Sequence, residues 1–288
     1  MTGPFPPIRR LGPEDRARCA ALSVDRGWAP EPFKWSLLLT ASEVFGVDAP
    51  DGRGLAGSVT LTSWGADYAA VGMMLVAARY ERRGLGRALM EHLLRAAGDD
   101  ATVTLFATDM GRPLYEKLGF TPVRRNVSFV GRFRVPSGHD GHGVRAATEA
   151  DLPAILALDR AAFGGDRGRI LSRLPAYADR IAVAEAGGPP GQGIVGYAAA
   201  WRNTTAYTVI GPLVAPDGET ARLLVTALAA DARTPVRLDL DPDRAELPGW
   251  AHAHGLEPAG RNVVMAHGEV AERGAPGHLF APISVALA

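Results

Sequence analysis

The most informative segment of the sequence reads Val71-Gly-Met-Met-Leu-Val76, then Ala-Ala-Arg-Tyr-Glu81, then Arg82-Arg-Gly-Leu-Gly-Arg-Ala-Leu89. An unbroken apolar segment, typical of a buried strand, leads into a basic loop with two glycines and then directly into a helix. Leu85, Leu89 and Leu93 recur at i, i+4 and i+8, which gives that helix one apolar face. The stretch therefore predicts a strand, a tight loop and an amphipathic helix.

The junction between this loop and the helix suits an anion. The first N–H groups of a helix have no internal partner and lie at the positive end of its dipole. Gly84 and Gly86 carry no side chain, so a phosphate can approach the backbone closely. Arg82, Arg83 and Arg87 add positive charge around the same point. The loop therefore predicts a site for a diphosphate.

The loop has two other interpretations. An isolated Gly-x-Gly at a helix start is more often only a tight strand-to-helix turn. A dinucleotide-binding loop needs a third glycine, and this sequence has Leu89 at that position. Such a loop also follows the first strand of its domain, whereas about 70 residues precede the loop here.

The order of expected elements in the first half places this unit late in a mixed α/β domain. We expect strands at 8–11, 44–47, 55–64, 69–76 and 102–107, helices at 14–26, 33–41, 85–97 and 112–118, and further strands through residue 130. One helix thus crosses between two neighbouring strands, as parallel pairing requires.

Two segments together resemble a known family. Val76–Leu89 is similar to motif A of the GCN5-related N-acetyltransferases (GNAT), and Leu114–Phe120 is similar to their motif B, at the usual spacing. The first motif A position, Gln or Arg in the family, is Glu81 here. The resemblance is strongest to the bacterial tandem type with a degenerate C-terminal domain. It implies an α/β fold of two tandem GNAT-like domains.

The resemblance also implies roles for particular residues. Acetyl-CoA would be the acyl donor, and Tyr115 would protonate its departing thiolate. Main-chain groups of the motif A strand and loop would bind the pantetheine and the diphosphate. The implied cofactor-binding residues are Met74, Leu75, Val76, Arg82, Arg83, Gly84, Leu85, Gly86, Arg87 and Ala88. The general base is not fixed by any motif, and the candidates near the acceptor cleft are Glu43, Asp67, Tyr68 and Asp109.

The chain repeats itself at an offset of 136 residues. Ile8–Asp15 is matched by Val144–Asp151, and Leu118–Val127 is matched by His254–Val263. Two matches at one offset indicate two copies of one domain. A polar, Pro/Gly-rich segment separates them. We therefore expect a catalytic domain at 1–135, a linker at 136–143 and a degenerate GNAT-like domain at 144–288.

The second copy lacks the features that the first copy keeps. Its counterpart of the motif A strand, Val209–Val214, is followed by a shorter loop without paired glycines. Asp217 and Glu219 bring negative charge to the predicted diphosphate position. The counterpart of Tyr115 is Ala251. We therefore expect one acetyl-CoA site per chain, and an apolar tail at 279–287 that packs within the chain or across a homodimer.

Composition excludes several other classes of function. Lys and Arg together number 31, as do Asp and Glu, so a nucleic-acid or membrane-binding surface is not expected. Cys19 is the only cysteine and is expected in the core. His139 and His142 have a spacing seen in metal sites but no third ligand nearby, so no metal is expected. The N-terminus has no signal-peptide pattern, and a cytoplasmic protein is expected.

The sequence thus predicts an N-acetyltransferase. It would move an acetyl group from acetyl-CoA to a primary amine, most simply that of a small molecule, by direct attack in a ternary complex. Two alternatives stay open: a non-catalytic acyl-CoA sensor that keeps the loop without a proton donor, and an interaction scaffold built from two degenerate domains.

Overall fold

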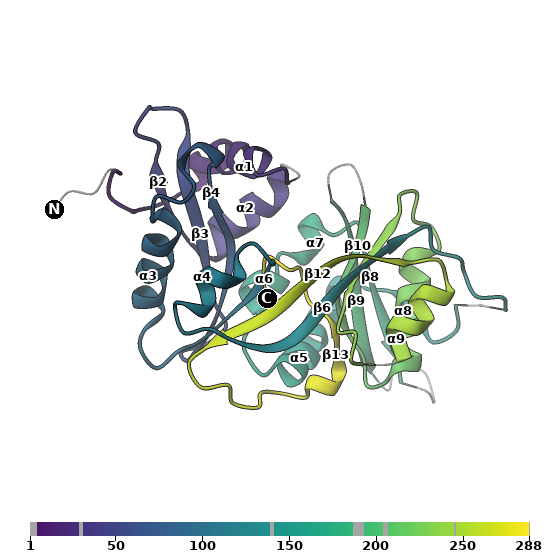
Figure 1. The fold of residues 1–288 in the computed structure, drawn as a ribbon. Coiled ribbons are helices and arrows are strands. Elements are labelled where there is room, and N and C mark those ends of the chain that lie inside the picture. The colour runs from purple at the N-terminus through teal and green to yellow at the C-terminus, as the bar shows by residue number, and fades with distance from the viewer. Residues whose placement is uncertain are drawn as a thin grey trace. The chain divides into compact units, whose positions relative to one another are not determined.

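The computed structural model describes residues 5–28, 31–138, 141–186, 193–203, 207–244 and 246–287 (Figure 1). Residues 139 and 140 of the predicted linker, including His139, lie outside these ranges. The chain forms two compact units. Unit 1 takes the described residues of Met1–Val123, Val264–Val270 and Ala286–Ala288, and unit 2 takes those of Arg124–Val263 and Ala271–Val285.

Unit 1 is a twisted sheet with helices on both faces. Its elements are β1 (Arg9–Arg10), η1 (Pro13–Asp15), α1 (Arg16–Asp25), α2 (Pro32–Ala41), β2 (Glu43–Asp48), β3 (Leu55–Ser63), β4 (Tyr68–Val76), η2 (Ala78–Tyr80), α3 (Leu85–Ala97), β5 (Thr102–Ala107) and α4 (Arg112–Glu116). The strand order is β1-β2-β3-β4-β5, followed by the end of β12 (Glu257–His267). Strands β4 and β5 are parallel, with α3 crossing between them.

The apolar stripe of α3 builds one layer of the unit 1 core. Leu85, Leu89 and Leu93 are all buried, as their spacing predicts, and α3 packs on β3 and β4. Helices α1 and α2 cover the opposite face of the same strands (Figure 1). Cys19 lies in this second layer with no exposed surface, which confirms it as a core residue.

Unit 2 repeats the architecture. Its elements are β7 (Val144–Ala146), η3 (Glu149–Asp151), α5 (Leu152–Phe163), α6 (Gly168–Leu171), α7 (Leu174–Tyr177), β8 (Arg180–Glu185), β9 (Ile194–Asn203), β10 (Tyr207–Val214), α8 (Gly218–Ala229), β11 (Val236–Leu240), α9 (Glu246–Ala253), η4 (Pro276–His278) and β13 (Leu279–Ala281). The strand order is β12-β6-β11-β10-β9-β8-β7, where β6 is Thr121–Gly131. Strands β10 and β11 are the parallel pair, and β13 pairs with β10.

Matched ion pairs give the sequence repeat a physical basis. Arg9 donates two hydrogen bonds to Asp15, at 2.8 and 2.7 Å, and holds the pKa of this buried carboxyl down at about 2. Arg145 likewise donates two hydrogen bonds to the carboxylate of Asp151, at 2.7 and 2.8 Å. In each unit the pair fixes the turn between the first strand and the first helix.

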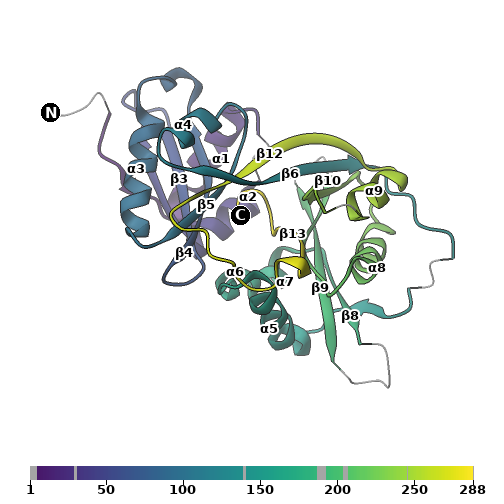
Figure 2. The same cartoon turned by 60° about the horizontal axis from the view of Figure 1, so that its bottom comes forward.

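The two long strands β6 and β12 exchange places between the repeats. They lie side by side (Figure 2). The second part of β6 pairs with β11, from Val127 opposite Leu240 to Gly131 opposite Val236. The end of β12 instead lies beside β5, and just past it Glu269 O accepts a hydrogen bond from Thr102 Oγ1, at 2.5 Å. The predicted boundaries at 135 and 144 therefore describe the repeat along the chain, and the compact units differ from them by this exchange.

Candidate active site

Strand β4 carries a bulge three residues before its end. Met73 and Met74 together stand opposite the single residue Val59 of β3. Met73 adopts a left-handed conformation, with φ of +46°. A bulge of this kind bends the strand and redirects its backbone groups. The strand that leaves the bulge is therefore aimed differently from the strand that enters it.

Beyond this bulge, β4 and β5 separate. Their parallel pairing ends at Val71, which faces Leu105. Residues Met74–Val76 still pair with β3 along one edge. Their other edge, which faces β5, pairs with no strand of the described chain. Backbone polar groups on that edge are consequently available to a ligand.

A cleft of about 710 Å³ opens between the separated strands. Nine of the eleven predicted site residues line it: Met74, Leu75, Val76, Arg82, Gly84, Leu85, Gly86, Arg87 and Tyr115. Arg83 and Ala88 do not. Lining residues that lie outside both motifs include Arg26, Trp28, Thr108, Met110, Gly111 and Pro113, while Tyr80, Leu114 and Lys117 come from the motif stretches without having been assigned a role. Arg26 and Trp28 come from the end of α1, whose approach to the cleft no local pattern reveals.

The N-terminus of α3 forms one wall of the cleft and has no side-chain cap. Gly84, its N-cap residue, has φ of +82°. The first intrahelical bond runs from Ala88 N to Gly84 O, at 3.1 Å. The N–H groups of Leu85, Gly86 and Arg87 precede that bond and have no partner inside the helix. This is the arrangement that binds anions at helix ends.

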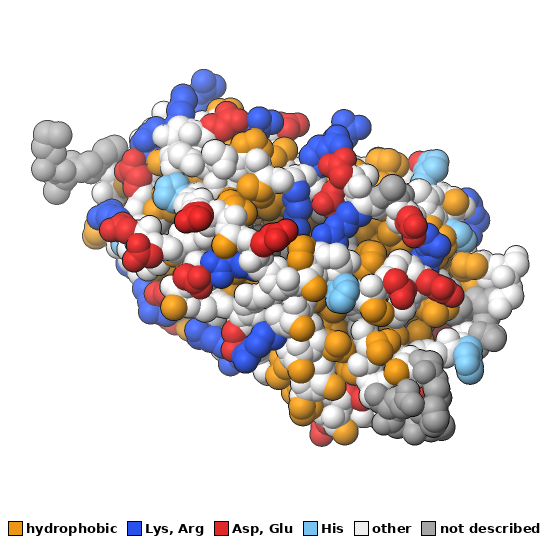
Figure 3. All heavy atoms as spheres, turned by 90° about the horizontal axis from the view of Figure 1, so that it is seen from below, with side chains coloured by type: hydrophobic (Ala, Val, Ile, Leu, Met, Phe, Trp, Pro, Cys, Tyr) orange, Lys and Arg blue, Asp and Glu red, His pale blue; other side chains and the backbone are white. Residues whose placement is uncertain are grey.

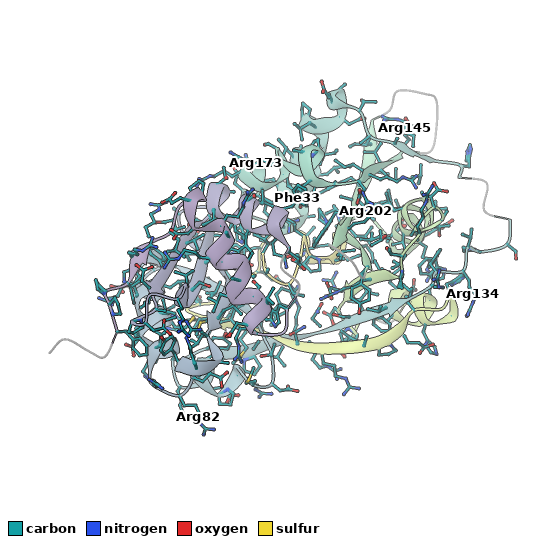
Figure 4. The ribbon with its side chains drawn as sticks, turned by 90° about the horizontal axis from the view of Figure 1, so that it is seen from above. Phe33, Arg82, Arg134, Arg145, Arg173 and Arg202 are labelled. Atoms are coloured by element: carbon teal, nitrogen blue, oxygen red, sulfur yellow. The ribbon has the colours of Figure 1, made fainter. Side chains whose placement is uncertain are left out.

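The charged side chains around the loop are arranged to favour an anion. Glu81, the departure from the family motif, forms an ion pair with Arg26 at 2.5 Å, so its charge is balanced. Arg82 has φ of +59°, and its side chain points outward from the loop (Figure 4). The Arg83 guanidinium instead lies over the Tyr80 ring, 5.6 Å from its centre.

Gly86 stands where the cleft is narrow and apolar. A Cβ at this position would lie 2.8 Å from Met74 Cε, 3.3 Å from a Leu114 methyl carbon and 3.7 Å from a Val76 methyl carbon. At Gly84, by contrast, a Cβ would meet nothing within 4 Å. The two glycines therefore serve different purposes: Gly84 supplies the left-handed turn, and Gly86 leaves room in the cleft.

Tyr115 faces the cleft from α4. Only 9% of it is exposed, and its ring packs 5.9 Å from the Phe120 ring. A side chain at Gly111 would come within 3.0 Å of the Tyr115 ring, so glycine there lets the tyrosine reach the cleft. Burial raises the pKa of Tyr115 to about 12. Among the described residues, no hydrogen bond uses its hydroxyl.

The four candidate bases lie elsewhere. None of Glu43, Asp67, Tyr68 and Asp109 lines the cleft. Glu43 forms an ion pair with Arg10 at 3.4 Å. The structure therefore places the predicted proton donor in the lining of the cleft and none of the four candidate bases, although Asp109 lies between two lining residues, Thr108 and Met110.

Strand β10 of unit 2 has the same bulge as β4, with different chemistry. Gly211 and Pro212 stand opposite the single residue Ala199. Pro212 occupies the position of Met74 and has no N–H to donate. The backbone that follows is paired, because Leu213 and Val214 bond to β13. The chain's own apolar tail thus takes the place that is open beside β4.

The first helix turn after β10 is also closed to an anion. The side chain of Asp217 accepts a hydrogen bond from Thr220 N, at 2.8 Å, and so caps α8. Glu219 adds a second negative charge in the first turn. Ala251, the counterpart of Tyr115, is fully buried in α9. Each feature that suits α3 and α4 to a ligand is missing from its counterpart.

The described residues show little sign of other classes of site. None of their helices combines the length and apolar character needed to cross a membrane. No three His, Cys, Asp or Glu residues among them are placed to hold a metal ion. Acidic and basic side chains are interspersed on the face drawn in Figure 3.

Comparison with known proteins gives a consistent result. Residues 14–120 match the family described as acetyltransferase (GNAT) family, and residues 155–281 match the acetyltransferase (GNAT) domain. The uncharacterised N-acetyltransferase YitH of Bacillus subtilis (strain 168) is 29% identical over 228 residues, which are 75% of this chain and 76% of that protein.

Solved structures share the fold over nearly the whole chain. A presumed acetyltransferase from Pyrococcus horikoshii is similar with a TM-score of 0.83 and 18% identity, over 100% of this chain and 98% of that one. A tandem GNAT protein from the clavulanic acid biosynthesis pathway is similar with a TM-score of 0.65 and 18% identity, over 92% and 99% of the two chains. At this identity the likeness concerns the fold.

Proposed function

The chain belongs to the GNAT family of acetyltransferases and carries two such domains in tandem, and from that premise we propose that unit 1 transfers an acetyl group from acetyl-CoA to a primary amine of a small molecule. One observation carries the proposal. The uncapped α3 terminus, the free edge of β4 and the Tyr115 hydroxyl all belong to a single cleft.

The loop and the start of α3 suit the diphosphate of the donor. The N–H groups of Leu85, Gly86 and Arg87 would donate to its oxygens, with the helix dipole in favour. Space beside Gly84 admits the phosphates to the backbone. Arg82 and Arg87 supply positive charge, and the ion pair with Arg26 keeps Glu81 from opposing it.

The free edge of β4 suits the pantetheine and the thioester. Those backbone N–H groups of Met74–Val76 that face away from β3, among them that of Val76, would donate to the pantetheine amides and to the thioester oxygen. As a neutral amine attacks, negative charge develops on that oxygen, and a fixed donor stabilises it without reorganising. Tyr115 is protonated at neutral pH, as an ordinary phenol is, and burial raises its pKa further. It would donate its hydroxyl hydrogen to the departing sulfur.

Direct attack by the amine is favoured over a covalent acetyl-enzyme. Cys19 is fully buried, burial raises its pKa to about 12, and it does not line the cleft. A thiol in that state is not a nucleophile at neutral pH. The cleft residues of the described chain include no cysteine, and the lysine among them, Lys117, follows α4 rather than β4.

An amine panel tests the function. Purified protein with acetyl-CoA should release free CoA thiol at a rate that rises on addition of at least one small primary amine, above the hydrolysis seen without amine. Binding of acetyl-CoA with no amine-dependent release across amino acids, polyamines and aminoglycosides would contradict the proposal and favour an acyl-CoA sensor. Release of CoA thiol with protein amines alone would support acetyl transfer but would replace the small-molecule acceptor with a protein.

A further inference from the structure

A hydroxyl on β3 holds the bulge of β4. Ser58 Oγ donates a hydrogen bond to Met73 O, at 3.1 Å. Ser58 has no exposed surface, so water does not compete for that carbonyl. Met73 is the bulge residue whose φ of +46° lies where residues other than glycine seldom sit. An unfavourable conformation persists only where its surroundings enforce it, and this bond supplies such a restraint.

Unit 2 provides an internal comparison at the same bulge. In unit 1, Ser58 stands opposite Leu75, one residue past the bulge. In unit 2, Ala198 stands opposite Leu213, the equivalent position. The bulge residue there is Gly211, which precedes Pro212 and is not among the glycines with positive φ. The left-handed bulge residue therefore occurs in the repeat that has the hydroxyl, whereas the repeat with alanine builds its bulge from a Gly-Pro pair.

We infer that Ser58 is a positioning residue for acetyl transfer. Its bond to Met73 O fixes the peptide that leads into Met74, and so sets the direction of the N–H groups that follow along the free edge of β4. Ser58 itself does not line the cleft. The inference rests on the proposed function of unit 1, because it assigns those N–H groups to the thioester.

Ser58→Ala tests the inference, with Thr60→Val as the matched control. Thr60 also lies on β3 with no exposed surface, and its Oγ1 has no hydrogen-bond partner in the described chain. Ser58→Ala should lower kcat at least ~10-fold, because a donor moved out of line stabilises the transition state poorly. KM and Kd for acetyl-CoA should stay within about twofold, since the diphosphate site is untouched. Thr60→Val should leave kcat within about twofold.

Two further results separate this role from a purely structural one. Ser58→Cys keeps a similar volume and a weak donor, so its kcat should fall between those of the parent and Ser58→Ala, and it serves if Ser58→Ala does not fold. An unchanged kcat in Ser58→Ala, or a lower melting temperature with raised Kd and normal kcat, would overturn the inference. A parent protein without amine-dependent turnover would instead overturn the proposed function.

Discussion

Replacing Tyr115 with phenylalanine is expected to lower kcat by ~100-fold, while the affinity for acetyl-CoA stays within about twofold. The change deletes one hydroxyl and keeps the ring, so packing against Phe120 survives. If the hydroxyl donates only as the thiolate leaves, its loss acts on the transition state and not on the bound ground state. The effect should therefore fall on kcat and kcat/KM together.

The raised pKa of Tyr115 gives this variant a second readout. Burial favours the neutral phenol, so the donor form is present at neutral pH and is lost only as the pH approaches about 12. A fall in kcat at pH 8–10 should consequently not come from Tyr115. Any limb of the pH profile in that range should persist, at lower amplitude, in Tyr115→Phe.

Tyr177→Phe is the matched control. Tyr177 lies in unit 2, and its buried hydroxyl has no hydrogen-bond partner among the described residues. The Tyr177→Phe variant therefore loses the same hydroxyl oxygen without a change in the cleft, and the kcat of this variant should equal that of the parent. If Tyr115→Phe retains a rate within about threefold of the parent, Tyr115 has no part in the chemistry, because loss of an ordinary hydrogen bond can produce a change of that size.

Gly86→Asp is expected to abolish acetyl-CoA binding without unfolding the protein. Two like charges about 5 Å apart repel by roughly 3 kcal/mol at an effective dielectric constant of about 20, which exceeds ~100-fold in affinity. The Cβ of the new side chain meets the ends of two side chains, the Met74 methyl at 2.8 Å and a Leu114 methyl at 3.3 Å, rather than the backbone. An acidic residue in the first turn of α3 is also favourable to the helix. Titration calorimetry and a melting curve measure the two effects.

Gly86→Asn separates charge from bulk, because asparagine has nearly the shape of aspartate. The affinity of Gly86→Asn should fall less than that of Gly86→Asp, and the gap between them should widen at low salt, where screening is weaker. Equal losses of acetyl-CoA affinity in both variants would show that Gly86 matters for steric fit alone and not for charge. Normal affinity in Gly86→Asp would show that the loop is only a turn.

The local part of the fold could be predicted because it depends on short-range patterns. The leucine stripe of α3 and the glycine turn at Gly84 follow from spacing and backbone freedom, and both are present. The loss of the anion site in unit 2 follows from Asp217, an N-cap residue whose side chain satisfies the helix end. The position of Tyr115 at the cleft follows instead from the resemblance to motif B, and the structure has Tyr115 on the short helix α4 in the cleft lining.

The remaining features depend on contacts between distant segments. The exchange of β6 and β12 depends on which strands they pair with. The apolar pattern of each strand suits pairing within its own repeat as well as pairing in the other, so the pattern does not predict the exchange. The pairing of Glu81 with Arg26, 55 positions earlier, leaves no local trace. The left-handed Met73 was not foreseen, because methionine is not a residue that marks such a turn and its restraint, Ser58, comes from another strand.

A calorimetric titration of the full chain with acetyl-CoA tests the central claim most directly. We expect the described residues to hold one competent site, in unit 1, since β13 covers the equivalent edge in unit 2 and Asp217 caps its helix. One equivalent should bind per chain in the parent protein, and none in Gly86→Asp. Two equivalent sites in the parent, or one site that persists at normal affinity in Gly86→Asp, would contradict the claim.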